Sequence, residues 1–371
     1  MKTAIKILKY AVGIDISKAD FKACFVSIDN NQHIKIIASR SFSNSNAGFK
    51  KLDQWINQKR KDNAIGLVLV LEATGVYYEN LAFFLQDKQY ALSVVLPNRA
   101  KKYLAYLGLK SKTDKIDAQG LAQMAAQQQL RLWQPATKFW YELRALTRHY
   151  QNLQEQKTAV GNQLEAATHS ANSSNFVLKS LKLQIKRLNL EVKKAAIAIK
   201  AQVQKDEKVY AKILGICKLK GLAILSVSTV LAETFGFELF ENYKQVISYS
   251  GYDVVENQSG KRSGKTKISK KGNSRIRRIL HMPAMVSIKY ENTAFCNLYN
   301  RTYEKHGIKM KSLVAVQKKL LITIYAMWKN NTAYDNQYYL ANIQRKGTGV
   351  SLSGKGSSEA ADQKNTLITT S

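Results

Sequence analysis

Two aspartates three residues apart, Asp114 and Asp117, are the first residues in this chain whose spacing suggests chemistry. On a helix, residues at positions i and i+3 lie on one face, so the two carboxylates would point the same way. Like charges at such close range raise a carboxyl pKa unless a cation lies between them. The flanking Lys112 and Lys115 could supply that cation, and so could a divalent metal ion, which prefers oxygen ligands. The spacing leaves both alternatives open, and a solvated, charged helix start is the simpler one.

The composition predicts a large anionic partner. The chain of 371 residues carries 58 Lys+Arg against 26 Asp+Glu, a formal net charge of +32. Such an excess favours nucleic acid above all, with an anionic membrane surface as the weaker alternative. No apolar run approaches the roughly 18 residues of a membrane span. The basic N-terminus runs directly into a strand pattern, without the apolar core or cleavage site of a signal peptide.

The cysteines and histidines do not form a metal site in the sequence. Cys24, Cys217 and Cys296 are far apart and not paired at metal-ligand spacing, so we expect reduced thiols in a cytoplasmic protein. The five histidines are also scattered. Any metal ion must therefore be held by carboxylates.

The first segment, residues 1–135, predicts an α/β domain that would position the acids. Strand patterns begin near residues 9, 20, 34, 66 and 91, and helical patterns cover residues 46–56, 77–86, 98–108 and 114–128. Asn46 is the expected cap of the first helix, and Pro97 the expected end of the last strand. The order β-β-β-α-β-α-β-α is that of an RNase H-like domain.

This order would bring four acids together. In such a fold the first and fourth strands are neighbours, so Asp15 and Glu72, at the ends of these strands, would meet. The closing helix can add Asp114 and Asp117. Each acid by itself is more simply a solvated terminus, but four converging acids in a chain poor in acids indicate a functional site.

Three motifs in this segment resemble the Asp-Glu-Asp-Asp insertion-sequence transposases, the insertion-sequence 110-type relatives of the Piv DNA invertases. They are Val12-Gly-Ile-Asp-Ile-Ser-Lys18, Glu72-Ala-Thr-Gly75 and Lys112-Thr-Asp-Lys-Ile-Asp-Ala118. The resemblance implies a RuvC-like N-terminal domain. It also implies a catalytic, Mg²⁺-binding tetrad formed by Asp15, Glu72, Asp114 and Asp117.

Aromatic and basic residues surround the expected site. Arg99, Lys101 and Lys102 form a basic patch beside Tyr103, which could bind a nucleic-acid backbone. Tyr77 and Tyr78 follow Glu72 and could stack on bases, although packing of the helix onto the sheet explains them equally well.

The middle segment, residues 136–205, predicts a coiled-coil arm. Apolar residues recur at heptad spacing in two runs, separated by a polar turn at residues 168–175. Two long helices folded back on each other are the expectation. The second helix is strongly basic, which favours nucleic-acid contact or support of a dimer over a merely solvated face. In the resembled family such an arm joins the two domains and helps protomers associate.

The third segment, residues 206–335, predicts a mostly helical domain. Gly215 and Gly221 bracket a tight connection between helices, with amides that could hold a phosphate. A basic stretch follows at residues 256–278. It is either a flexible loop that neutralises phosphates or the setting of a serine nucleophile, because cations stabilise the charge of a phosphoryl transition state. We predict that its cations bind nucleic acid collectively: Lys261, Lys265, Lys270, Lys271, Arg275, Arg277 and Arg278.

This stretch resembles the second domain of the same transposases, through its Ser-Gly and Ile-Ser-Lys-x-Gly-Asn elements. The resemblance assigns the nucleophile to Ser259, with Ser269 second and Ser263 third. An apolar helix is expected at residues 315–328. The polar end of the chain, residues 336–371, has the composition of a disordered tail.

The resemblance implies a transposase that cuts and rejoins DNA at element ends and target. It further implies a structured guide RNA, a homo-oligomer (dimer or tetramer), and a composite site in which the tetrad of one protomer meets the serine domain of another. Two alternatives stay open: a RuvC-like, metal-dependent junction nuclease, and a basic DNA-binding protein without enzymatic activity.

Overall fold

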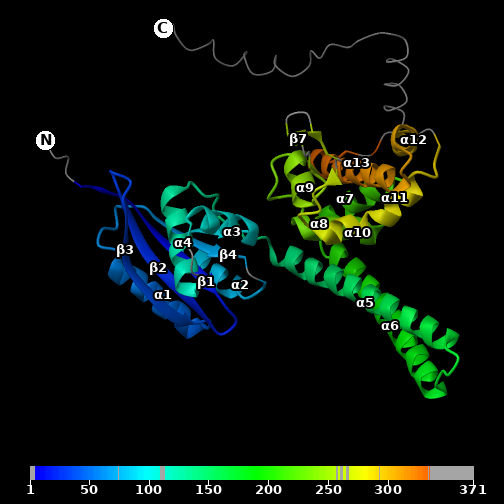
Figure 1. Cartoon of the computed structure of the whole chain (residues 1–371), viewed down its shortest axis with the longest axis horizontal. Helices are drawn as coiled ribbons and strands as arrows, with labels where there is room; N and C mark the ends of the chain where they lie inside the picture. Colours follow the sequence, from blue (N-terminus) through cyan, green and yellow to red (C-terminus); the bar gives the residue numbers. More distant parts are fainter. Residues whose placement is uncertain are drawn as a thin grey trace, which may run out of the picture. The chain divides into compact units, whose positions relative to one another are not determined.

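The computed structural model describes residues 5–73, 75–108, 113–255, 258–259, 262–264, 267–291, 293–332 and 334 (Figure 1). The chain divides into two compact units, Met1–Pro135 and Ala136–Ser371. Each unit has its own buried apolar residues. Within the described residues, no helix is both long enough and apolar enough to cross a membrane.

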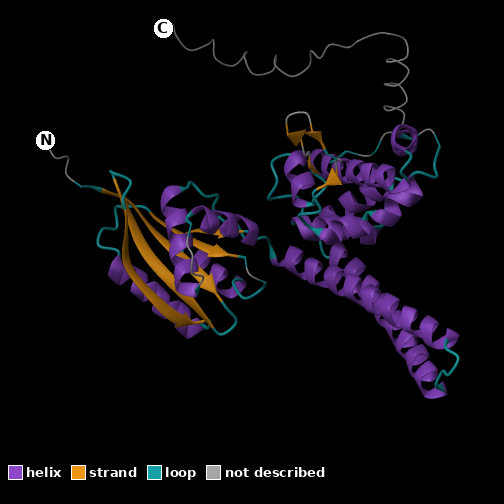
Figure 2. Cartoon of the chain, in the orientation of Figure 1, coloured by secondary structure: helices purple, strands orange, loops and turns teal. Residues whose placement is uncertain are grey.

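Unit 1 is an α/β domain whose elements follow the predicted order (Figure 2). They are β1 (Ile7–Ile16), β2 (Asp20–Asp29), β3 (Ile34–Ser43), α1 (Asn46–Lys59), β4 (Leu67–Glu72), α2 (Glu79–Asp87), β5 (Ala91–Val95), α3 (Pro97–Tyr106) and α4 (Asp114–Gln127).

The five strands form one sheet in the order β3-β2-β1-β4-β5. Strand β2 runs antiparallel to both β1 and β3, whereas β1, β4 and β5 are parallel. The predicted adjacency of the first and fourth strands is therefore confirmed. Their register pairs Ile14 with Leu71, which sets the positions of the acids that follow.

Helices cover both faces of this sheet. Alternate residues of β1, such as Val12 and Ile14, pack with α1 and α2, because successive side chains of a strand point to opposite faces. The intervening residues pack with α3 and α4. Helix α4 lies very close to β1 at Gly13, where an added Cβ would come within 2.2 Å of the Ala118 carbonyl oxygen. Glycine at this position lets α4 approach the sheet.

Two predicted element ends differ from the structure. Ser45, not Asn46, caps α1, because its hydroxyl accepts the N–H of Gly48 and leaves Asn46 as the first helical residue. Pro97 is the first residue of α3 and follows the end of β5 after one intervening residue, instead of merely closing the strand. Its missing N–H costs nothing at the first position of a helix.

Unit 2 is mostly helical. Its long helices α5 (Lys138–His169) and α6 (Asn175–Gln204) pack against each other, on either side of the predicted turn. The other elements are α7 (Glu207–Cys217), α8 (Ile224–Thr234), α9 (Tyr243–Tyr249), β6 (Val254–Val255), β7 (Gln258–Ser259), β8 (Arg262–Ser263), β9 (Lys267–Ile268), α10 (Ser274–Ile279), α11 (His281–Ser287), α12 (Ala294–His306) and α13 (Lys309–Asn330).

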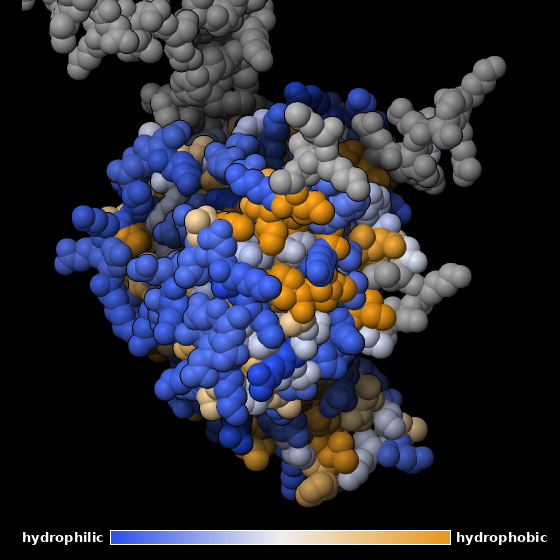
Figure 3. Space-filling view, turned by 90° about the vertical axis from the view of Figure 1, so that its left-hand side faces the viewer, coloured by the Kyte–Doolittle hydropathy of each residue, from blue (hydrophilic) through white to orange (hydrophobic). Residues whose placement is uncertain are grey.

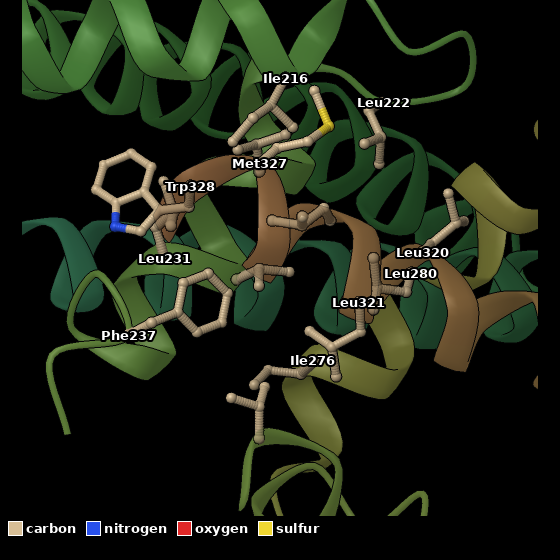
Figure 4. Close-up of a cluster of buried hydrophobic side chains, with 14 of the residues drawn as sticks. Ile216, Leu222, Leu231, Phe237, Ile276, Leu280, Leu320, Leu321, Met327 and Trp328 are labelled. Atoms are coloured by element: carbon tan, nitrogen blue, oxygen red, sulfur yellow. The ribbon is translucent and has the colours of Figure 1, made fainter. Parts of the chain in front are cut away.

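The core of unit 2 lies between α8, α13 and the helices around them. Figure 4 shows Leu231 and Phe237 in the same cluster as Leu320 and Trp328 of α13. Helix α13 begins six residues before the predicted start at residue 315. Burial of each such side chain is worth roughly 1.5–3 kcal/mol.

Candidate functional site

Asp15 and Glu72 stand on neighbouring parallel strands. Each directly follows one member of the last registered pair, Ile14 and Leu71. Neighbouring strands are about 4.8 Å apart, so the two acids are adjacent across the sheet. Because Ile14 and Leu71 face α1 and α2, alternation directs Asp15 and Glu72 to the face covered by α4. Both acids are half-buried.

Asp114 and Asp117 lie in the first turn of α4. The Thr113 hydroxyl caps this helix by accepting the N–H of Ile116 at 3.3 Å. The helical interpretation of the motif is thus confirmed. Carboxylates are favoured at this end of a helix, where unpaired N–H groups carry a partial positive charge.

The cation that contacts Asp114 is Lys22. Its Nζ lies 3.2 Å from Asp114 Oδ2. Lys22 is directly opposite Asp15 in the β1–β2 register, so it links the strand that bears Asp15 to the start of α4. Sequence reasoning considered Lys112 and Lys115, and Lys112 lies outside the described residues. It missed Lys22 because the pairing spans 92 residues.

The sheet thus brings two of the four predicted metal ligands side by side, and α4 carries the other two at its N-terminus. Among the described residues, no group of three or more His, Cys, Asp or Glu side chains is arranged to hold a metal ion. The donor chemistry fits Mg²⁺, which prefers carboxylate oxygens. Convergence of all four side chains on one ion stays a prediction.

The preferred serine lies on a short hairpin in unit 2. Strands β7 and β8 are antiparallel, and Ser259 pairs with Arg262. Ser263, the third candidate, pairs with Gln258 on the same hairpin. The side chains of both serines, and all of Lys261 and Lys265, lie outside the described part of the structure.

Ser269 occupies a packed position. Its Oγ is buried without a hydrogen-bond partner among the described residues, and its N–H donates to the Asp253 carbonyl at 2.8 Å. Three residues on, Gly272 lies so close to the chain before it that an added Cβ would be 2.5 Å from the Tyr249 carbonyl oxygen. The Ile-Ser-Lys-x-Gly-Asn element is therefore held against residues 249–253.

A buried carboxylate anchors this element. Glu233 of α8 is 1% exposed and accepts two hydrogen bonds from Arg148 of α5, at 2.6 and 2.8 Å. It also accepts one at 2.6 Å from Asn273, whose own side-chain oxygen caps α10 by accepting the N–H of Arg275 at 3.0 Å. Helices α5 and α8 thereby fix the end of the basic stretch.

The pKa of Glu233 lies below its usual value. Burial alone would raise this pKa, but the hydrogen bonds and positive charge of Arg148, helped by Asn273, outweigh burial. Sequence reasoning missed Glu233, because it treated residues 223–234 as a small apolar helix. Glu233 is the single acid within residues 223–234, and its place in an otherwise uncharged helix could have indicated a buried ion pair.

The arginines predicted to bind phosphate have protein partners. Arg275 donates to Gln151 and Asn152 of α5, both at 3.2 Å. Arg277 donates to the Ser250 carbonyl at 2.8 Å, and Arg278 forms an ion pair with Glu155. Lys270 and Lys271 are exposed. The lysines are therefore better placed than the arginines to meet an external phosphate.

The predicted basic patch of unit 1 lies on α3. Arg99, Lys101 and Lys102 are exposed, and Arg99 donates to Gln128 at 3.3 Å. Tyr103 is 8% exposed, and its hydroxyl donates to Gln127 of α4. Tyr103 thus packs α3 against α4, and the exposed basic residues of α3 are the part of the predicted patch that faces solvent.

Comparison with known proteins gives two family matches. A model described as a DEDD transposase of the IS110 type matches residues 12–171, and one described as the IS116/IS110/IS902 transposase family matches residues 215–300. Pilin gene-inverting proteins of Moraxella bovis and Moraxella lacunata are each 29% identical over 332 residues, which cover 89% of this chain and 99% of theirs.

Solved structures add little to these matches. Thermus thermophilus RuvC, free and in complex with a Holliday junction substrate, aligns with 33% and 31% of this chain and with 99% and 90% of its own. The identities are 12% and 11%, and with TM-scores of 0.26 and 0.24 we infer neither fold nor function from these structures. The two family matches are more informative, and they show that this chain carries IS110-family transposase domains, at residues 12–171 and 215–300.

Proposed function

We propose that this transposase cuts and rejoins DNA with a metal-binding tetrad, Asp15, Glu72, Asp114 and Asp117, and with Ser259 as its nucleophile. The proposal of a metal-binding tetrad rests on the position of Asp15 beside Glu72, on the sheet face covered by α4. The family match and the Ser-Gly element support the serine.

The carboxylates would hold a divalent ion, Mg²⁺ in our proposal, that neutralises charge on the reacting phosphate when bound. The half-buried pair Asp15 and Glu72 would provide one side of this site, and the first turn of α4 the other. Lys22, already in contact with Asp114, would supply positive charge beside them.

The serine step conserves the energy of the phosphodiester bond. Ser259 Oγ loses its proton and forms a bond to the phosphorus, while the bond from phosphorus to one strand oxygen breaks and that oxygen takes up a proton. The hydroxyl of the incoming strand then attacks the same phosphorus, and Ser259 regains its proton as it leaves. Cations near Ser259 would stabilise the charge of both transition states.

The partners follow from family and charge. The relatives named above invert a pilin gene, and we propose the same DNA strand exchange for this chain, at the ends of an element and at a target. The net charge of +32 would neutralise phosphates of two bound DNA duplexes and of a guide RNA. We further propose that the chain acts in the cytoplasm as a homo-oligomer, a dimer or tetramer, with α5 and α6 as a coiled-coil arm that supports association.

The test is Ser259→Ala, with Ser263→Ala on the paired strand of the hairpin as its matched control. The full-length protein is incubated with element-end DNA and Mg²⁺, and products are separated on denaturing gels. Ser259→Ala should lose both the covalent protein–DNA adduct and the joined strands, whereas Ser263→Ala keeps them. Joining by Ser259→Ala at the normal rate would rule out this serine as the nucleophile.

The same experiment separates the junction-nuclease alternative. A RuvC-like nuclease hydrolyses DNA with metal ions and needs no serine. Two results together would favour that function. Ser259→Ala would cleave a four-way junction in Mg²⁺ as fast as the unchanged protein, and the unchanged protein would form no covalent adduct with DNA.

A further inference from the structure

Four side chains form a row across the sheet of unit 1. Asp15 pairs with Lys22, Lys22 pairs with Ser41, and Glu72 lies next to Asp15 on the other side. Paired residues of neighbouring strands share a face, so the row Glu72, Asp15, Lys22, Ser41 lies on the face covered by α4. The strands β4, β1, β2 and β3 that carry it can be followed in Figure 1. The row changes from two acids to a cation and a hydroxyl.

A hollow of about 270 Å³ lies at the cationic end of this row. Lys22, Ser39 and Ser41 line it from β2 and β3, and Lys115 lines it from the first turn of α4. Arg40 also contributes to its wall. Among the described residues around the hollow, no carboxylate lines it. The side of the molecule seen in Figure 3 is largely hydrophilic, with a patch of apolar residues near its centre.

These groups fit a phosphate. Lysine ammonium groups and serine hydroxyls are standard donors to backbone phosphates of nucleic acid. Two lysines, Lys22 and Lys115, line the hollow from the α4 face, and Lys22 also pairs with Asp114. The Arg40 guanidinium lies over the Phe42 ring. The two lysine charges favour an anion in the hollow.

Spacing connects the hollow to the carboxylates. Asp15 and Lys22 lie on adjacent strands, about 4.8 Å apart, and Ser41 lies one strand further, about 10 Å from Asp15. A nucleic-acid strand laid along the row would place one phosphate at the acids and another at the hollow. The strand whose phosphate lies at the acids is the strand that is cut. In the proposed function that strand is DNA, so we expect DNA and not RNA in the hollow.

We propose that this hollow, formed by Lys22, Ser39, Ser41 and Lys115, binds a backbone phosphate of the DNA strand close to the reacting one. The inference rests on the proposed function for the placement of the reacting phosphate at Asp15 and Glu72. Lys22 then has two partners: Asp114 before DNA and metal arrive, and the DNA phosphate afterwards.

This double role predicts opposite effects of one substitution. Lys22→Gln removes a cation that competes with metal for Asp114, so Mn²⁺ binding to the DNA-free protein should tighten roughly two- to fivefold, the range for a solvent-exposed charge pair. The same substitution removes a phosphate contact. The slope of log K against log salt for a duplex should therefore fall in magnitude by about 0.9.

The experiment measures both quantities on the full chain. Mn²⁺ affinity is read by electron paramagnetic resonance, and binding of a labelled duplex is read by fluorescence anisotropy in EDTA at several salt concentrations. The variants are Lys22→Gln, Lys115→Gln and the charge-preserving Lys22→Arg. Lys51→Gln is the matched control, because Lys51 is exposed on α1, which covers the opposite face of the sheet.

The expected result is a reduced salt slope for Lys22→Gln and Lys115→Gln, an unchanged slope for Lys51→Gln, and a restored slope for Lys22→Arg. A slope unchanged in both lysine variants would overturn the proposal, and so would an equal fall in Lys51→Gln. A fall seen only with a structured RNA probe would assign the hollow to RNA and also overturn it. If Lys22→Gln does not fold, Lys115→Gln decides.

Failure of the proposed function would look different. DNA binding in EDTA needs no metal ion, so its salt slope is readable even if the acids do not bind metal. Absence of Mn²⁺ binding in the unchanged protein would contradict the tetrad, whereas an unchanged DNA slope would contradict only the hollow.

Discussion

At the scale of single residues, the chemistry of unit 1 depends on a close pair of acids. Asp15 and Glu72 follow the registered pair of two parallel strands, and both are half-buried. Two carboxylates held this close are costly without a cation. Lys22 provides one positive charge beside Asp15. A divalent ion would supply further positive charge to this group of acids.

Replacing one of these acids should abolish metal-dependent chemistry. Asp15→Asn keeps the shape of the side chain but removes a charged ligand, so we expect strand cleavage in Mg²⁺ to fall more than about 100-fold. Asp87→Asn, an exposed change on α2, is the control. Products on denaturing gels give the rate. Cleavage by Asp15→Asn at the unchanged rate would contradict Asp15 as a metal ligand.

The second residue-scale prediction concerns Glu233. Glu233→Gln leaves Arg148 without its ionic partner, so we expect a loss of about 2–3 kcal/mol in the free energy of unfolding at neutral pH. This is below the cost for a fully buried pair, because 40% of the Arg148 side chain is exposed. Urea unfolding measures it, and Glu165→Gln on the exposed face of α5 is the control.

The pH dependence of this loss has a definite sign. The pKa of Glu233 is lowered in the folded protein, so its stabilising effect is present above the unfolded value of about 4.5. It is lost as the pH falls through the lower folded value. The difference between the unchanged protein and Glu233→Gln should therefore shrink on acidification below pH 4.5. A difference that is constant from pH 7 to pH 3 would contradict the role of the ionised carboxylate.

At the scale of elements, the contact between β1 and α4 positions the acids. The chain backbone of α4 reaches β1 at Gly13, two residues before Asp15. Helix α4 also begins with a capped first turn that contains Asp114 and Asp117. The distance between strand acids and helix acids is thus controlled by a residue without a side chain.

Gly13→Ala should separate these elements. The new Cβ would lie about 2.1 Å from the Ala122 nitrogen, so α4 has to move outward. We expect a loss of roughly 1–3 kcal/mol in stability, typical of overpacking, together with weaker Mn²⁺ binding. Gly66→Ala is the matched control, because no atom lies within 4 Å of its added Cβ. Equal stability of the two variants in urea would contradict the close packing.

At the scale of the whole molecule, charge should govern binding. A net charge of +32 on 371 residues implies many phosphate contacts and the release of many counterions. With six to ten such contacts, duplex affinity should fall about 10³- to 10⁵-fold between 50 and 200 mM salt. Fluorescence anisotropy across that range measures the fall. A change below tenfold would show that electrostatic contacts are few.

Much of the fold was predictable from local patterns. Alternating and continuous apolar runs identified all five strands of unit 1, because side chains must alternate between the two faces of a sheet. The helical pattern of residues 114–128 predicted α4 in the same way. Caps were less predictable, since Ser45 and Asn46 are both good capping residues and only the backbone conformation selects one.

Contacts between distant residues needed the folded chain. Lys22 meets Asp114 across 92 residues, and Arg148 meets Glu233 across 85. Nothing in the local sequence of either pair identifies its partner. The same holds for the arginines of the basic stretch, which the sequence offers as phosphate ligands and which the fold engages with α5 and with backbone carbonyls.

In unit 1 the sequence by itself determined which elements form and that acids would stand at strand ends and at a helix start, because periodicity is a local property. Only the tertiary structure decided that Lys22 joins the acids, that a hollow opens beside it, and that Glu233 anchors the end of the basic stretch. Strand register and helix packing determine such contacts, and both arise from burying apolar faces far apart in the chain.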